Sequence, residues 1–150
     1  MRGHSKGMTW EQALAEAVPD DESVLGQDHL SLAPEPFNVG VARRFVGSFV
    51  QRSCRDAFDV AQLLTSELVT NAVIHARTQL HVTVAMTSCC LMVLVHDEDL
   101  GRREVDRHDR DGGRGLELVK ALSTRSGLIH HPGGGKTAWF SLAARAQATA

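Results

Sequence analysis

The sequence predicts an α+β fold, a two-layer α/β sandwich in which helices cover one face of a mixed, mostly antiparallel sheet. Three observations support this fold class. Segments with helical or strand-like apolar spacing follow in the order strand, helix, helix, strand, strand, loop, helix, strand, strand. This grouping of helices is typical of a sheet covered on one face. The 150 residues are 43% hydrophobic, which suits one domain with a core, and they contain no internal repeat.

Residues 1–28 are predicted to form an N-terminal appendage with one short amphipathic helix. Thr9 and Gln12 have the spacing of a capping box, with Thr9 as the N-cap. Apolar residues then follow at helical spacing: Trp10, Ala13, Leu14, Ala17 and Val18. We expect this helix to pack on the domain, because Trp10 is too large to remain in water. Docking of a partner protein is the alternative.

The predicted domain spans residues 29–144, and it begins with a minimal strand at 30–32 and two helices. The first helix is marked by apolar residues at helical spacing, which are Val39, Ala42, Val46, Phe49 and Val50. The second helix is expected to start with Asp56 as its N-cap and to end near His75.

The second half of the domain is predicted to supply most of the sheet. Residues 80–86 alternate between apolar and polar, which predicts a half-buried strand, and the apolar run 91–95 predicts a central strand. The segment 96–113 is rich in charge and glycine. The remaining predicted elements are a helix at 116–122, strands at 127–130 and 137–142 joined by a hairpin turn, and a tail at 145–150.

Composition excludes several classes of function. The net charge of −2, without a basic stripe, argues against nucleic-acid binding. No apolar run approaches the roughly 20 residues that span a bilayer, and no secretory segment is recognisable. The three cysteines lack metal-like spacing. We therefore expect a cytoplasmic protein with reduced thiols that binds neither nucleic acid nor membrane.

Polar residues interrupt the second predicted helix on one side. Glu67, Asn71 and His75 recur at intervals of four residues, and Glu67 lies within about 40° of Asn71 around the helix. The same side carries Val60, Leu63, Leu64 and Ile74. A carboxylate on a core-facing stripe is costly unless it is paired, and a metal ion or ligand would be such a partner. A glutamate at the rim of the core is the alternative.

Two glycine-rich segments invite a phosphate-binding interpretation. Gly112, Gly113 and Gly115 lead into a predicted helix N-terminus, which together with Arg114 would bind an anion; a flexible loop is the alternative. The segment 133–137 opens a strand rather than a helix, so it is not a phosphate loop. The acidic cluster between Asp97 and Asp111 is interleaved with arginines, which favours a mobile lid over a metal site.

The order of these motifs resembles the GHKL superfamily of ATP-binding domains, which includes gyrase B, the Hsp-type chaperones, MutL and the histidine kinases. Residues 67–72 resemble its N box, 97–101 its first glycine box, 112–116 its second, and 135–137 its last. Within the superfamily, the size and the run 65–75 are most similar to the anti-sigma factor serine kinases of the RsbW and SpoIIAB type. The resemblance implies a Bergerat-type ATP-binding fold.

The resemblance implies a role for each matching residue. Glu67 would be the general base, Asn71 would hold Mg²⁺, and Asp97 would accept the adenine amino group, supported by Thr137. The implied nucleotide-binding residues are Asn71, Asp97, Gly101, Gly112, Gly113, Arg114, Gly115, Leu116 and Thr137. The implied cofactors are ATP and Mg²⁺, with residues 98–112 as a lid.

The function that the resemblance implies is ATP-dependent phosphorylation of a serine or threonine on an anti-sigma factor antagonist, together with binding of a sigma factor. The alternative is a non-catalytic regulatory module in which ATP is structural or absent. Glu67 favours the kinase. Asp99 favours the binding module, because it occupies the position of the first glycine in its box. A homodimer is also compatible with the sequence.

Overall fold

The computed structural model describes residues 9–76, 78–98 and 109–145, with the backbone alone for 109–114. It confirms the predicted fold class. Five strands form one sheet in the order β1-β2-β3-β5-β4, and every neighbouring pair is antiparallel. The strands are β1 (Val24–Leu32), β2 (Leu80–Thr87), β3 (Cys90–Asp97), β4 (Arg125–His130) and β5 (Lys136–Ala143).

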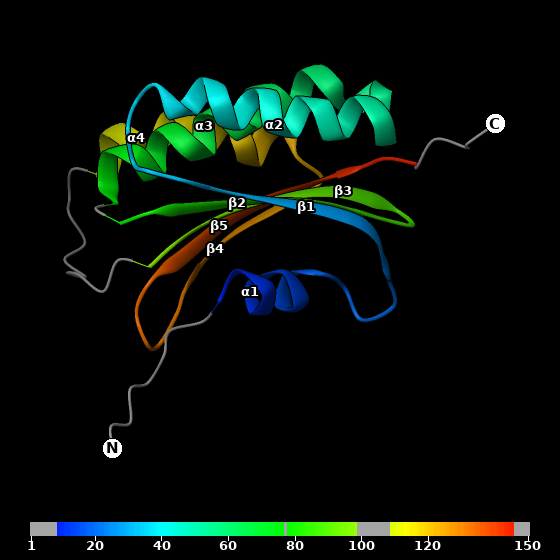
Figure 1. Ribbon diagram of the computed structural model, residues 1–150, viewed down its shortest axis with the longest axis horizontal. Helices are drawn as coiled ribbons and strands as arrows, with labels where there is room; N and C mark the ends of the chain where they lie inside the picture. Colours follow the sequence, from blue (N-terminus) through cyan, green and yellow to red (C-terminus); the bar gives the residue numbers. More distant parts are fainter. Residues whose placement is uncertain (1–8, 77, 99–108, 146–150) are drawn as a thin grey trace.

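Three helices form the second layer, on one face of the sheet (Figure 1). They are α2 (Asn38–Ser53), α3 (Phe58–His75) and α4 (Asp109–Leu122). The shorter helix α1 (Trp10–Ala17) lies on the opposite face (Figure 1). The two layers are thus the predicted ones, and α1 adds a partial cover to the second face of the sheet.

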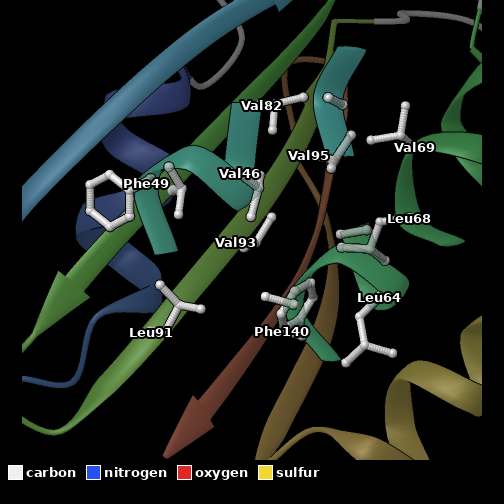
Figure 2. Close-up of a cluster of buried hydrophobic side chains, with 14 of the residues drawn as sticks. Val46, Phe49, Leu64, Leu68, Val69, Val82, Leu91, Val93, Val95 and Phe140 are labelled. Atoms are coloured by element: carbon white, nitrogen blue, oxygen red, sulfur yellow. The ribbon is translucent and has the colours of Figure 1, made fainter. Parts of the chain in front are cut away.

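The main core lies between the helical layer and the sheet. As predicted, α2 buries Ala42, Val46, Phe49 and Val50. Figure 2 shows Phe140 of β5 near Leu64 and Leu68 of α3 within this core, and all three side chains are fully buried. Burial of such side chains is worth roughly 1.5–3 kcal/mol each, so this interface holds α3 firmly against the sheet.

The start of α3 differs from the sequence prediction. Asp56 does not cap the helix, because it lies in a 3₁₀ turn, η1 (Arg55–Ala57). Ala57 takes the N-cap position, and no side chain bonds to the first turn. The tight turn after α2 satisfies backbone groups locally, so a capping side chain is not required.

The prediction that β2 is half-buried is wrong. Leu80, Val82, Val84 and Met86 do face the helical layer, as the alternation indicated. The intervening side chains are covered as well, because Ala85 packs in a second cluster under α1. The central position and full burial of β3 agree with the prediction from its continuous apolar run.

The N-terminal helix packs on the domain, as predicted. Thr9 and Gln12 form the complete capping box, and α1 buries Ala13, Leu14 and Ala17. Trp10 stacks on His29 of β1, with ring centroids 4.0 Å apart. Strand β1 begins at Val24, well ahead of the three-residue strand that the sequence indicated. Its additional residues extend the antiparallel pairing with β2 back towards α1.

The hairpin between β4 and β5 is also confirmed. Gly134 and Gly135 have φ angles of 109° and 89°, which only glycine adopts readily. Of the two adjacent cysteines, Cys90 is buried and Cys89 is exposed. Within the described residues, no helix is long and apolar enough to cross a bilayer.

Candidate functional site

The side of α3 that carries Glu67 faces α4. A Cβ atom built on Gly115 of α4 would lie 3.2 Å from Glu67 Oε2, so the carboxylate rests against the glycine backbone. Any larger residue at position 115 would displace this carboxylate. The structure therefore brings together two motifs that are far apart in the sequence.

The expectation that Glu67 lies on a core-facing stripe is corrected. The buried residues of α3 are Ala61, Leu64, Thr65, Leu68, Val69 and Ala72. Glu67 and Asn71 are half-buried at the flank of that face, whereas Leu63 and Ile74 are 44% and 66% exposed. The sheet lies under the face centred near Leu68, which turns Glu67 towards α4. Glu67 therefore lies at the rim of the core and does not carry a full burial cost.

The second glycine motif lies inside α4 rather than before it. The sequence placed the helix at 116–122, but α4 begins at Asp109, so Gly112, Gly113 and Gly115 are helical. In an α-helix only the first four N–H groups lack an intrahelical acceptor. The amides of Gly113 and Gly115 are therefore used within the helix in this conformation. Each glycine lowers the stability of the helix by about 1 kcal/mol relative to alanine, so little free energy is needed to unwind the first turns of α4.

Asp97 is held at the end of β3, on the face that carries the helices. Leu91, Val93 and Val95 alternate with it and pack in the main core. The Asp97 side chain is 2% exposed, and its Oδ2 lies 3.4 Å from Lys136 Nζ. A Cβ on Gly135 would lie 2.5 Å from the Asp97 carbonyl oxygen, so only glycine permits this approach of the hairpin. Asp97 is thus held against the start of β5 by its carboxylate and by its backbone.

The predicted support of Asp97 by Thr137 is corrected. Lys136 pairs with Asp97 across the sheet, whereas Thr137 pairs with His96 and lies on the face covered by α1. The Thr137 hydroxyl is buried and lies 2.8 Å from both His96 Nδ1 and His131 Nε2. The side chain beside Asp97 is therefore a lysine, which the sequence interpretation did not single out. Its antiparallel register with Asp97 is the signal that identifies it.

A row of histidines crosses the α1 face of the sheet. Successive rings from His29 through His81 and His96 to His131 have centroids 5.4, 5.9 and 5.3 Å apart. Burial lowers the pKa of His29, His96 and His131 from the ordinary value. His96 Nε2 and His131 Nδ1 are buried and have no hydrogen-bond partner among the described residues. Both histidines are therefore held neutral, and sequence reasoning missed the row because it forms only when the strands pair.

Folding stability is expected to fall in mild acid because of these histidines. Their folded-state pKa values are lowered from 6.5, so the unfolded chain binds protons first. The stabilisation is complete above pH 6.5 and is lost as pH falls towards the folded-state values, by up to about 1.4 kcal/mol per pH unit for each histidine. Urea unfolding at a series of pH values measures this slope. His131→Gln should reduce the slope by more than the control His130→Gln, because His130 is exposed and is the smallest contributor to the lowered pKa of His131. An unchanged slope in His131→Gln would contradict this account.

The other predicted site residues are only partly described. The backbones of Gly112, Gly113 and Arg114 lie in α4, and Leu116 packs against the main core. Gly101, Asp99 and most of the predicted lid lie outside the described residues. Among the residues that are described, no cluster of three histidine, cysteine or carboxylate side chains could hold a metal ion.

Comparison with known proteins identifies the family of this chain. A family model described as the histidine kinase-like ATPase domain matches residues 32–142. No curated protein matches the chain. The matched range covers α2, α3 and α4 and includes Glu67, Asn71, Asp97 and Gly115. On its fold and on this match, the chain belongs to the histidine kinase-like ATPase domain family.

Proposed function

We propose that this protein is an ATP-binding regulatory protein kinase that phosphorylates a serine or threonine of a partner protein. The observation that carries the proposal is the position of Glu67, whose carboxylate rests against Gly115 at the junction of α3 and α4. A carboxylate at the rim of the core, beside a glycine-rich helix, is suited to take a proton near bound phosphates. The family match supports the ATP-binding part of the proposal.

The residues present fit an adenine nucleotide. Asp97 is a buried acceptor at a strand end, and it would accept the amino group of adenine. Gly115 carries no Cβ that would fill the space beside Glu67. Asn71 lies one turn after Glu67 on α3, and its amide oxygen is a ligand type that Mg²⁺ accepts. Bound Mg-ATP would supply the phosphoryl group and a cation that offsets its charge.

The roles of the chain's own residues follow from this arrangement. Glu67 would take the proton from the partner's hydroxyl group as that oxygen bonds to the γ-phosphorus of ATP, while the bond from this phosphorus to the bridging oxygen breaks and ADP leaves. Asp97 would hold the base, and Asn71 would contribute a ligand to the metal ion. The amides around Gly113 bind phosphate once the first turns of α4 open, since in the helix they are already bonded.

The proposed partners are an anti-sigma factor antagonist as phosphoryl acceptor and a sigma factor held inactive, in a cytoplasmic setting. Incubation with Mg²⁺ and γ-labelled ATP, with each candidate antagonist protein, tests the kinase. Label on a serine or threonine of the antagonist supports the proposal. ATP binding without transfer to any candidate would favour the second function, a non-catalytic regulatory module. The helical state of the glycine motif in α4 is the observation that favours this second function.

Opening of α4 gives a testable expectation. Gly112→Ala combined with Gly113→Ala should stabilise the helical state by about 2 kcal/mol, since each alanine is about 1 kcal/mol better than glycine in a helix. If phosphate requires the open state, ATP affinity should fall by about tenfold or more. Isothermal titration measures the affinity. The matched control is Gly40→Ala on α2, where a Cβ meets only the flexible side chains of Arg43 and Arg44. Unchanged or tighter ATP binding in the double variant would exclude the opening of α4.

A further inference from the structure

The ammonium group of Lys136 forms an ion pair with Asp97, and it has no role in the nucleotide binding proposed so far. Lys136 is the first residue of β5, and it pairs with Asp97, the last residue of β3. Its Nζ lies 3.4 Å from Asp97 Oδ2. We infer that Lys136 is a second base-reading residue, whose ammonium group donates a hydrogen bond to N1 of adenine while Asp97 accepts from the neighbouring amino group. This inference rests on the proposed ATP binding.

The position of Lys136 allows this role. The Asp97 side chain is 2% exposed and that of Lys136 is 22% exposed, so the lysine side chain is open to solvent where the carboxylate is not. An ammonium group carries three N–H donors. Among the described residues, Nζ has Asp97 as its only charged or hydrogen-bonded partner. Donors therefore remain for a ligand placed against Asp97.

The pair also matches the edge of the base. Adenine presents a donor, its amino group, directly beside an acceptor, N1. Asp97 and Lys136 present an acceptor beside a donor, with Oδ2 and Nζ 3.4 Å apart. A hydrogen bond to a charged donor contributes more than a neutral one, so this contact should have a measurable share of the affinity. Guanine offers the reverse order of donor and acceptor, so GTP serves as a separate arm of the test.

Lys136 has a second effect, because it neutralises a buried carboxylate. Removing the ammonium group would leave Asp97 buried without this partner, which is costly. A loss of affinity in a Lys136 variant would therefore not by itself show a contact with the base. The test must change the acceptor on the nucleotide as well as the donor on the protein.

The experiment is a cycle of two proteins and two nucleotides, and wild type is also titrated with GTP. Wild type and Lys136→Met are titrated calorimetrically with ATP and with 1-deaza-ATP, in which a C–H group replaces N1. Wild type should bind 1-deaza-ATP about tenfold or more weakly than ATP. Lys136→Met should bind the two nucleotides alike. The control Lys120→Met removes the same charge from an exposed position on α4, and it should keep the wild-type preference.

Each other outcome overturns the inference in a recognisable way. Equal wild-type affinity for ATP and 1-deaza-ATP would exclude a contact with N1 and leave ATP binding intact. A preference that persists in Lys136→Met would assign the N1 contact to another group. Tighter ATP binding by the variant would show that Lys136 obstructs the base, and tighter binding of GTP than of ATP by wild type would show that the pair reads guanine. A folded wild-type protein that binds no ATP would overturn the proposed function and this inference together.

If Lys136→Met does not fold, as judged by circular dichroism, Lys136→Ala takes its place in the same cycle.

Discussion

Glu67→Gln is expected to abolish phosphoryl transfer and to leave nucleotide affinity close to that of wild type. Glutamine has the shape of glutamate, so it fits beside Gly115, where the carboxylate now lies. An amide cannot take the proton of a hydroxyl group, and loss of a general base typically lowers the rate by about 10²–10⁴. Single-turnover phosphorylation of the partner protein, run beside an ATP-binding titration, separates the two quantities.

The control for this prediction is Glu117→Gln, which removes a carboxylate from an exposed position on α4. This variant should transfer phosphate at the wild-type rate. A Glu67→Gln protein that remains active would defeat the proposed mechanism. A variant that loses ATP binding as well as transfer would indicate that Glu67 acts in binding, through the metal or the phosphates, rather than as a base.

Asp97→Asn is expected to cause the largest loss of nucleotide affinity and to weaken the preference for adenine. The carboxylate accepts the amino group of adenine with a full negative charge, whereas the asparagine side chain supplies a neutral acceptor and also a competing donor. Hydrogen bonds to charged groups contribute about 1.5–3 kcal/mol, so affinity should fall by roughly tenfold to a hundredfold. Titration of ATP and GTP into both proteins measures the affinity and the preference.

Asp28→Asn is the matched control for this second variant. Asp28 lies on β1 and forms an ion pair with Arg52, with 3.7 Å between Oδ2 and Nη2, at an exposed position far along the sheet from Asp97. Breaking that pair should change neither affinity nor preference, because exposed ion pairs contribute little. If Asp97→Asn binds ATP as tightly as wild type, Asp97 does not read the base. Equal affinity of wild type for ATP and GTP would exclude adenine selection.

Local apolar patterns were sufficient to predict most elements of this fold. The spacing in α2 and the continuous run in β3 identify both elements, because each is decided by burial against the main core. The starts of α3 and α4 were harder to predict from the sequence. The 3₁₀ turn before α3 replaces an N-cap, and three glycines that favour a loop in isolation are drawn into α4. Such boundaries depend on neighbouring elements and not on local propensity.

The site was predicted less completely than the fold, for a geometric reason. Successive residues of a strand point to opposite faces, so choosing Thr137 in place of Lys136 moves the residue to the wrong side of the sheet. The contact of Glu67 with Gly115 depends on how α4 packs on α3, which no single segment encodes. The histidine row requires the register of three strands and the packing of α1. The residue types were readable, but their partners were set by tertiary structure.

The family match covers less of the chain than the part that packs together as one folded unit. The match begins at residue 32, which is the last residue of β1, so its boundary excludes nearly all of an edge strand and the whole of α1. A protein that began at residue 32 would lack α1, which covers Met92 and Leu94 on the second face of the sheet. It would also leave the edge of β2 without its partner strand β1. Unpaired edges beside apolar surface invite association between chains. The smallest autonomous unit is therefore expected to be larger than the matched range, because α1 and β1 cover an apolar face and a strand edge that would otherwise be open to association.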